Sequence, residues 1–239
     1  MTHAPMKIVI LTGAGISAES GLRTFRASDG LWEDHRVEDV ATPEAFIRDP
    51  ALVQRFYNQR RKDAAAAQPN AAHRALGRLM TDPRFDVLLV TQNVDDLHER
   101  GGAPAVLHMH GSLAGALCAA CDARWPAPAV MAVSDPCPEC AAAATRPDIV
   151  WFGEMPYRME EIWAALSDCD LFAAIGTSGQ VYPAAGFVQV AARAGADTVE
   201  LNLDASATSR DFGRHILGPA GTTVPAWVEE LLAATPDPA

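Results

Sequence analysis

The chain has 239 residues, of which 49% are hydrophobic, and a formal net charge of −11 at pH 7. This length suits one large α/β domain, or one such domain with a small insertion. The negative charge argues against direct nucleic-acid binding, which requires a basic surface. No apolar run approaches the roughly 20 residues that span a bilayer. Because residues 1–7 also lack the apolar region of a signal peptide, we expect a cytoplasmic protein that does not bind membranes.

A glycine turn follows the first predicted strand. Residues 7–12 are apolar and partly β-branched, which is typical of a buried strand. They lead into Gly13–Gly15, and Ala18 completes a G-x-G-x-x-G/A turn, in which the backbone approaches a pyrophosphate. The acid usually found about 20 residues later would be Glu33 or Asp34, which lie in a predicted loop. We therefore predict a dinucleotide bound differently from that of an ordinary dehydrogenase; a tight turn without a ligand is the alternative.

The segment after this turn does not have the pattern of a packing helix. Residues 19–26 are polar, contain two arginines and lead into a loop with Gly30 and Trp32. A packing helix would show an apolar stripe instead. We predict that residues 18–32 form a mobile loop that covers a cofactor.

The rest of the chain alternates helical and extended patterns. Thr42 is the predicted N-cap of a helix with Pro43 in its first position, and the pattern continues to about residue 68, with a break near residues 49–50. Such alternation indicates a Rossmann-like doubly wound parallel sheet. Further helices are predicted over 71–80, capped by Asn70, and over 159–167, 183–193 and 224–233, and extended segments over 85–91, 105–108, 148–154, 170–178 and 198–204.

Two C-x-x-C pairs separated by 15 residues predict a zinc ribbon made by Cys118, Cys121, Cys137 and Cys140. Four thiolates complete a tetrahedral zinc site, so the metal should be structural and should stabilise a module with little core of its own. Four free cysteines are the alternative. We predict that this small module is inserted at 113–147 in a dinucleotide-binding domain formed by 1–112 and 148–239, and that residues 27–70 are candidates for the same small lobe.

Polar residues follow several predicted strands, where open parallel sheets bind ligands. Asn93 and Asp95 are two residues apart and point the same way in an extended segment. They are candidates to bind ribose hydroxyls or a carboxamide, and an Asx turn is the alternative. Residues 176–178 and 202–204 end two more strands and could line an adenosine pocket, although ordinary turns also explain them.

Two further groups are candidates for chemistry. His110 follows a strand and precedes Gly111, and an unperturbed pKa near 6.5 suits a general base. A structural role is its alternative, and His108 on the same face is the competing histidine. Tyr57 and Arg60 are three residues apart and share a helix face, where the arginine could bind a carboxylate. A solvated basic face is the alternative for that pair.

Taken together, these stretches resemble the sirtuin family of NAD-dependent protein-lysine deacylases, over roughly residues 7–232. Tyr57-x-x-Arg60 and Ala27 are similar to class III, the branch that includes bacterial deacetylase/desuccinylases. Val94 stands where isoleucine is common in the family. The motifs that carry the resemblance are residues 13–17, 21–26, 91–95, 110–111, 150–154, 176–178 and 202–204, together with the four cysteines.

The resemblance implies a role for each matching residue. His110 would be the catalytic base, with Asn93 also catalytic, and the cysteines would hold one structural zinc. Tyr57 and Arg60 would bind an acidic acyl end. The substrate backbone would pair, as an added strand, with Val150, Trp151, Phe152, Gly153 and Glu154. NAD would be bound by Gly13, Ala14, Gly15, Ile16, Ala18, Thr24, Phe25, Arg26, Trp32, Gln92, Asn93, Val94, Asp95, His110, Gly176, Thr177, Ser178, Asn202, Leu203, Asp204 and Ala220.

The implied reaction removes acetyl, succinyl or malonyl groups from lysines of partner proteins. An amide oxygen is a weak nucleophile, so it needs the electrophilic sugar carbon that forms as nicotinamide leaves, in a site closed to water. His110 would then deprotonate a ribose hydroxyl, and the products would be lysine, nicotinamide and O-acyl-ADP-ribose. The alternatives are an NAD-dependent mono-ADP-ribosyltransferase, a non-catalytic NAD-binding module and a hydride-transferring dehydrogenase.

Overall fold

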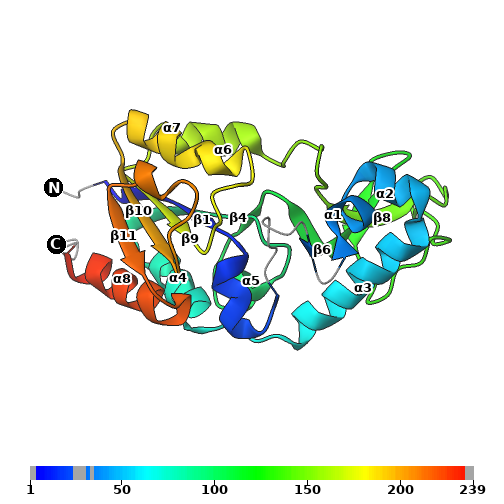
Figure 1. The fold of residues 1–239 in the computed structure, drawn as a ribbon, viewed down its shortest axis with the longest axis horizontal. Helices are drawn as coiled ribbons and strands as arrows, with labels where there is room; N and C mark the ends of the chain where they lie inside the picture. The colour runs from blue at the N-terminus through cyan, green and yellow to red at the C-terminus, as the bar shows by residue number, and fades with distance from the viewer. Residues whose placement is uncertain (1–3, 24–30, 33–34, 235–239) are drawn as a thin grey trace.

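The computed structural model describes residues 4–23, 31–32 and 35–234. Its larger part is a six-stranded, all-parallel sheet with strand order β11-β10-β9-β1-β4-β5 (Figure 1). The order reverses between β1 and β9, so the ends of these two strands form the kind of crevice where such sheets bind ligands. The strands are β1 (Met6–Thr12), β4 (Phe85–Thr91), β5 (Leu107–His108), β9 (Leu171–Ile175), β10 (Asp197–Asn202) and β11 (Arg214–Leu217).

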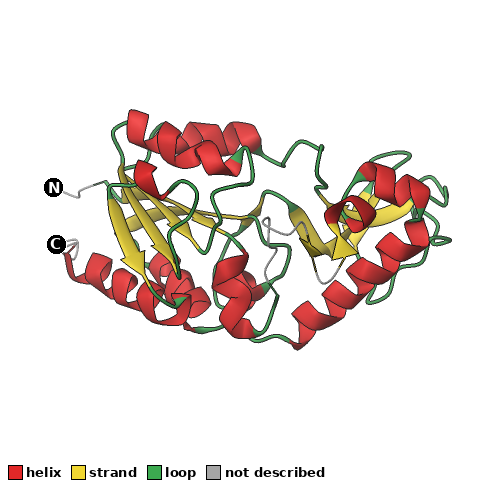
Figure 2. Ribbon diagram, in the orientation of Figure 1, coloured by secondary structure: helices red, strands yellow, loops and turns green. Residues whose placement is uncertain are grey.

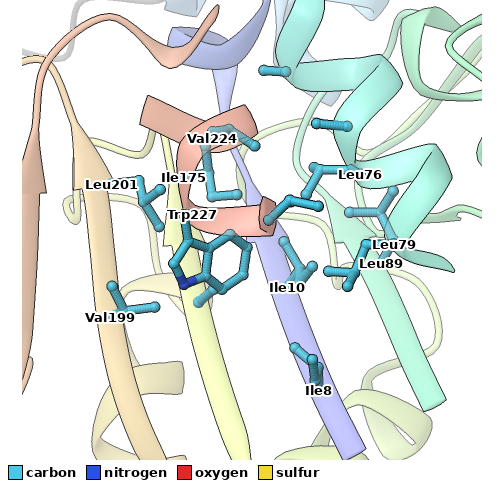
Figure 3. Close-up of a cluster of buried hydrophobic side chains, with 14 of the residues drawn as sticks. Ile8, Ile10, Leu76, Leu79, Leu89, Ile175, Val199, Leu201, Val224 and Trp227 are labelled. Carbon is cyan, nitrogen blue, oxygen red and sulfur yellow. The ribbon is translucent and has the colours of Figure 1, made fainter. Parts of the chain in front are cut away.

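Helices cover both faces of this sheet, as the prediction of a doubly wound sheet required (Figure 2). Side chains alternate between the faces of a strand, so Ile8 and Ile10 enter one core and Val9 and Leu11 the other. Trp227 packs in the first of these cores (Figure 3). The first face is covered by α4 (Ala71–Thr81) and α8 (Ala220–Ala234), the second by α6 (Met159–Leu166) and α7 (Phe187–Arg193).

A second group of elements lies beside the sheet and forms a smaller lobe (Figure 1). Its apolar core joins Val53 and Phe56 to Leu113 and Trp151. Gln54 Nε2 also donates a 2.9 Å hydrogen bond to the carbonyl of Thr145, so the long helix is tied to the antiparallel sheet β7-β6-β8. The elements of this lobe are α1 (Val37–Val40), α2 (Pro43–Arg48), α3 (Pro50–Ala66), β6 (Gly111–Cys118), β7 (Arg124–Pro126) and β8 (Thr145–Ile149).

Short elements complete the structure. The predicted caps are confirmed, because the Thr42 side chain accepts from the N–H of Ala45 and Asn70 forms a capping box with His73. In the described part of the chain, none of the helices has the length and apolar character needed to cross a bilayer. The short elements are η1 (Ala14–Ser20), β2 (Leu31–Trp32), β3 (His35–Arg36), α5 (Leu97–Arg100), η2 (Ala184–Gly186) and η3 (Ser209–Asp211).

The structure differs from several sequence-based predictions. The extended segment predicted over 148–154 is strand β8 at 145–149, followed by a turn, and the strand predicted over 105–108 has two residues. Strand β6, which ends at Cys118, and strand β7 within the proline-rich cysteine segment were not predicted: β6 is rich in glycine and alanine, which have low strand propensity, and β7 has three residues including a proline. Pairing supports them, because β6 lies between β7 and β8. Helix α8 begins at Ala220 instead of Val224, since its first residues lack apolar periodicity.

Candidate active site

A cavity of about 500 Å³ lies between the carboxyl ends of the parallel strands and the smaller lobe. The loops after β1, β4, β9 and β10 form one side of it, and α3 and the segment after β8 form the other. Most of the predicted site residues therefore meet at one place. The predicted residues that line it are Gly13, Ala14, Gly15, Tyr57, Arg60, Gln92, Asn93, Val94, Asp95, His110, Val150, Trp151, Phe152, Gly153, Glu154, Gly176, Thr177, Ser178, Asn202, Leu203 and Asp204.

Some predicted residues lie elsewhere. Ile16 is fully buried in the core beside Ile8, Ala18 is exposed on η1, and Ala220 packs against the core at the start of α8. Thr24, Phe25, Arg26, Glu33 and Asp34 lie outside the described residues, and only the backbone of Trp32 is described, in β2. The lining residues that sequence reasoning did not assign are Ser17, Leu22, Arg23, Ala41, Ile149, Pro156, Gln180, Val181, Tyr182, Ala205, Ser206 and Ala207; of these, only Ser17, Leu22 and Arg23 belonged to quoted motifs.

The loops after β1 and β9 touch through glycine backbone. The N–H of Gly13 donates to the carbonyl of Ile175 at 3.0 Å, and the N–H of Gly15 donates to that of Gly176 at 2.9 Å. A Cβ atom on Gly15 would lie 2.7 Å from the Cα of Gly176, which leaves no room for a side chain. Gly176 itself has φ +64° and a Cβ there would lie 2.4 Å from the N atom of Ile16. The glycines therefore create a tightly packed floor where the backbones of the two loops meet beside the cavity, and the absence of side chains there lets a phosphate come close.

Asn93 and Asp95 are joined by Ser17. The Asn93 amide nitrogen donates to the carbonyl of Gly13 at 3.1 Å and to the Ser17 hydroxyl at 3.2 Å. That hydroxyl donates to Asp95 Oδ2 at 3.3 Å, while Asp95 Oδ1 accepts the N–H of Leu97 at 3.1 Å. Burial raises the pKa of Asp95, and both side chains are only 7% exposed. Because its side-chain nitrogen is engaged, Asn93 offers its side-chain oxygen, Oδ1, to a ligand.

Two buried histidines, His73 and His98, lie next to this cluster and form hydrogen bonds with hydroxyl groups there. His73 Nδ1 accepts the N–H of Asn70 at 3.2 Å, so in the neutral ring Nε2 carries the hydrogen and lies 3.5 Å from the Ser17 hydroxyl. His98 Nε2 lies 2.9 Å from Thr12 Oγ1 at the end of β1. Burial lowers the pKa of His73 to about 4 and that of His98 well below its usual value. Both rings are therefore neutral at pH 7 and act as fixed hydrogen-bond partners.

His110 is the histidine suited to accept a proton. Its Nδ1 lies 3.3 Å from the Gln92 carbonyl, which can only accept, so Nδ1 carries the hydrogen and Nε2 is the basic atom. Burial lowers its pKa to about 4, so the ring is neutral at pH 7. His108 instead has Nδ1 3.1 Å from the Asn93 carbonyl and Nε2 2.7 Å from Glu99 Oε1. Burial lowers its pKa, but the bond to Glu99 outweighs this and the pKa is raised, so His108 is held in an ion pair.

A buried carboxylate, that of Glu200, lies behind the cavity residue Asn202. Asn202 Nδ2 donates to the carbonyl of Thr177 at 2.8 Å and to Glu200 Oε1 at 3.2 Å, which leaves the Asn202 carbonyl oxygen to accept from a ligand. Glu200 is fully buried and also accepts from the N–H of Ser206 at 3.3 Å and from His215 at 3.2 Å. Burial raises its pKa, but these hydrogen bonds outweigh it and the pKa is lowered. The ionised Glu200 therefore fixes the orientation of Asn202.

Tyr57 and Arg60 both line the opposite side of the cavity, one turn apart on α3. The Tyr57 side chain is fully buried, and its phenol oxygen accepts the indole N–H of Trp151 at 3.0 Å. Burial raises the pKa of Tyr57, so the phenol stays neutral. A neutral phenol beside a guanidinium can bind a carboxylate.

Backbone N–H groups of the segment after β8 are already engaged in hydrogen bonds within the protein. The predicted added strand therefore has fewer donors available on this segment than its sequence indicates, and strand pairing with a substrate stays a prediction. The backbone N–H groups already bonded are those of Val150 to the His110 carbonyl (2.9 Å), Trp151 to Glu154 Oε2 (2.8 Å) and Phe152 to the Ala41 carbonyl (3.0 Å).

The four predicted zinc ligands lie together, with their Sγ atoms all within 4.8 Å of one another. Cys118 and Cys140 are 3.7 Å apart, as are Cys121 and Cys137. A tetrahedral zinc with Zn–S bonds of about 2.3 Å places thiolates about 3.8 Å apart, so this geometry fits the ion. The backbone N–H groups two residues after Cys118 and Cys137 donate to their sulfurs at 3.4 Å. None of the four lines the cavity, so the zinc they are positioned to bind is structural.

The fold and the site define a class of protein: an α/β enzyme that uses a dinucleotide and carries a separate zinc module. A family model described as the Sir2 family matches residues 13–183. The chain is 57% identical to an NAD-dependent protein deacylase of Bdellovibrio bacteriovorus, over 94% of this chain and 96% of that protein. It is 55% identical to an NAD-dependent protein deacylase of Vibrio cholerae, over 95% of this chain and 94% of that protein. The chain therefore belongs to the Sir2 family.

Solved structures agree with this assignment. A Sir2 homologue in complex with NAD superposes with a TM-score of 0.87 at 36% identity, covering 96% of this chain and 90% of that one. A Sir2 homologue mutant in complex with 2'-O-acetyl ADP ribose superposes with a TM-score of 0.86 at 36% identity, covering 95% of this chain and 92% of that one. A complex of Sir2, a p53 peptide and NAD+ gives 0.76 at 26% identity, again with 95% and 92% covered.

Proposed function

We propose that this chain removes acyl groups from lysine side chains of proteins in a reaction that consumes NAD. The observation that carries this proposal is the neutral His110, which lines one cavity together with the Asn93–Ser17–Asp95 cluster and the Tyr57–Arg60 pair. The relatives described above are named NAD-dependent protein deacylases, which favours this activity over mono-ADP-ribosyl transfer.

In this proposal each side of the cavity has a separate task. Bound NAD would supply an electrophilic sugar carbon and nicotinamide as the leaving group. The glycine floor after β1 and β9 holds the phosphates, and the Asn93 carbonyl oxygen and Asp95 hold the nicotinamide half. Asn202 accepts from the adenosine half. His110 takes a proton from a ribose hydroxyl at Nε2, and bound NAD and substrate would have to displace the water that otherwise competes with the acyl oxygen.

The acyl preference is assigned to Tyr57 and Arg60. An acetyl group has no charge at its end, whereas succinyl and malonyl groups end in a carboxylate. Arginine binds carboxylates through charge-assisted hydrogen bonds, and the neutral Tyr57 adds a phenol at the same wall. We therefore propose that the enzyme accepts acetyl-lysine and, through this pair, succinyl- and malonyl-lysine.

Mass spectrometry of acylated peptides tests the proposed function. Peptides that carry acetyl-, succinyl- or malonyl-lysine are incubated with the zinc-loaded protein and NAD. We expect free lysine, nicotinamide and the matching O-acyl-ADP-ribose. Transfer of label from NAD to protein without loss of acyl groups would indicate an ADP-ribosyltransferase, and NAD binding without nicotinamide release would indicate a non-catalytic module.

The remaining assignments are also proposals. We propose a small lobe built from both the zinc module, 113–147, and part of 27–70, which the shared core of α3 and β6 supports. The dinucleotide domain would then be the rest of 1–112 with 148–239. A cytoplasmic location and the lack of direct nucleic-acid binding stay predictions; the net charge of −11 supports the second.

A further inference from the structure

The backbone around His110 is held by residues 148–157, which lead from β8 to α6 and which we call the bridge segment. The N–H of Val150 donates to the His110 carbonyl at 2.9 Å, and the N–H of Tyr157 donates to the Met109 carbonyl at 2.9 Å. The bridge segment is therefore bonded at two points beside the proposed base. A change in its shape would displace the His110 backbone, and with it the basic atom Nε2.

Asp148, the first residue of the bridge segment, packs directly against strand β6, which begins one residue after His110. A Cβ atom on Gly111 would lie 2.1 Å from the Asp148 carbonyl oxygen, and one on Gly115 would lie 2.9 Å from the Asp148 Cβ. The Asp148 side chain is only 16% exposed. Asp148 is thus fixed against the strand that continues from the proposed base.

The side chains of Asp148 and Tyr157 tie the two ends of the bridge segment together. The Tyr157 hydroxyl donates to Asp148 Oδ1 at 2.7 Å. Arg124 completes the cluster, because its Nε lies 3.3 Å from Asp148 Oδ2 and a terminal nitrogen donates to the Tyr157 oxygen at 3.4 Å. A guanidinium only donates and an ionised carboxylate only accepts, so each hydrogen bond of the phenol has a single direction. The bond between residues nine positions apart restricts the shape of the backbone between them.

This cluster also connects the bridge segment with the zinc module. Arg124 lies in β7, three residues after the predicted zinc ligand Cys121, and pairs with Leu117 of β6. None of the side chains of Arg124, Asp148 and Tyr157 lines the cavity. Any effect of this cluster on the reaction must therefore act through the residues that it holds in place.

We propose that Tyr157 and Asp148 are positioning residues for the proposed base: the hydrogen bond between their side chains holds the bridge segment in the shape that places His110 for proton removal. The proposal rests on the deacylase function proposed above. Neither side chain touches the reacting groups, so their contribution should appear in the step that uses His110 and not in the step that releases nicotinamide.

The substitution Tyr157→Phe tests this role, because it removes the hydroxyl and keeps the ring beside Arg124. In the proposed function nicotinamide leaves before His110 removes a proton, so two rates separate the steps. Exchange of labelled nicotinamide into NAD, with saturating acetyl-lysine peptide, reports the first step, whereas formation of O-acetyl-ADP-ribose requires both. We expect product formation to fall about five- to tenfold, the effect of one lost hydrogen bond to a charged group, while exchange changes less than about twofold.

Variants of Asp148 separate positioning from general damage. Asp148→Asn keeps an oxygen that can accept from Tyr157 and should retain most of the product rate, whereas Asp148→Ala should lower it as Tyr157→Phe does. In the Asp148→Ala background, Tyr157→Phe should cause no further loss. Glu161→Gln, which weakens the ion pair with Arg158 at the start of α6, is the matched control and should change neither rate.

The same measurements can overturn the proposal. Equal losses of exchange and product formation in Tyr157→Phe, an unchanged product rate, or a full additional loss in the Asp148→Ala background would each do so. Should Tyr157→Phe fail to fold, Asp148→Ala must show the same selective loss of product formation, and its absence overturns the proposal equally. If the wild-type protein catalyses neither exchange nor product formation, the proposed function fails instead.

Discussion

The contact between the loops after β1 and β9 gives a sharp prediction for Gly15→Ala. The added Cβ would lie 2.7 Å from Gly176 Cα and 2.8 Å from its carbonyl oxygen, and both are backbone atoms that cannot rotate away. Overpacking of this kind costs about 1–3 kcal/mol. For a chain of this size each kcal/mol lowers Tm by roughly 2–4 °C, so we expect a fall of about 2–12 °C. The displaced floor should also weaken NAD binding about tenfold or more.

Thermal unfolding and titration with NAD measure both effects. Gly213→Ala is the control, because the nearest atom to its added Cβ lies 3.6 Å away, an ordinary contact distance. Its Tm and NAD affinity should change little. If Gly15→Ala behaved like Gly213→Ala in both assays, the reasoning that close backbone contact shapes a phosphate-binding floor would be refuted.

Three further predictions concern charge and metal. Arg60→Met should lower succinyl-lysine turnover about 10- to 100-fold and acetyl-lysine turnover far less, measured as kcat/KM; equal losses would refute an acyl-binding role. Chelation of zinc should release one zinc per chain and unfold the small lobe, seen as lost protection from hydrogen exchange in β6 and β8 but not in β1. Glu99→Gln should lower the pKa of His108, measured by NMR titration, because the bond to Glu99 contributes most to raising it. Since that pKa is raised in the folded protein, the stability lost in this variant should be largest below about pH 6.5 and should shrink as pH rises through the raised pKa of His108; a stability difference independent of pH would contradict the ion pair.

The sequence predicted those features that depend on local chemistry. Thr42 and Asn70 cap helices because their side chains reach N–H groups two or three residues away, and the four cysteines gather because a zinc ribbon has a fixed spacing. The doubly wound parallel sheet followed from alternation of strands and helices, although its edge strand β11 was not predicted. These patterns need no knowledge of distant contacts.

The features that the sequence could not predict depend on residues far apart in the chain. Ser17 joins Asn93 and Asp95 across more than 70 residues, and Trp151 reaches Tyr57 across 94. Spacing alone left the choice between His108 and His110 open, because the two residues lie two positions apart at the end of the same strand; only the family resemblance favoured His110. Only the burial of His110 and the position of Glu99 beside His108 distinguish the base from the ion pair.

The central claim is that a neutral His110 in the cavity between the two lobes couples NAD cleavage to capture of an acyl oxygen. Nicotinamide release by zinc-loaded protein, with and without acyl-lysine peptide, tests it most directly. We predict release that depends on the peptide and yields O-acyl-ADP-ribose, with a loss of about 10²- to 10⁴-fold in product formation for a folded His110→Ala variant. Equal release of nicotinamide in the presence and absence of the peptide would contradict the account.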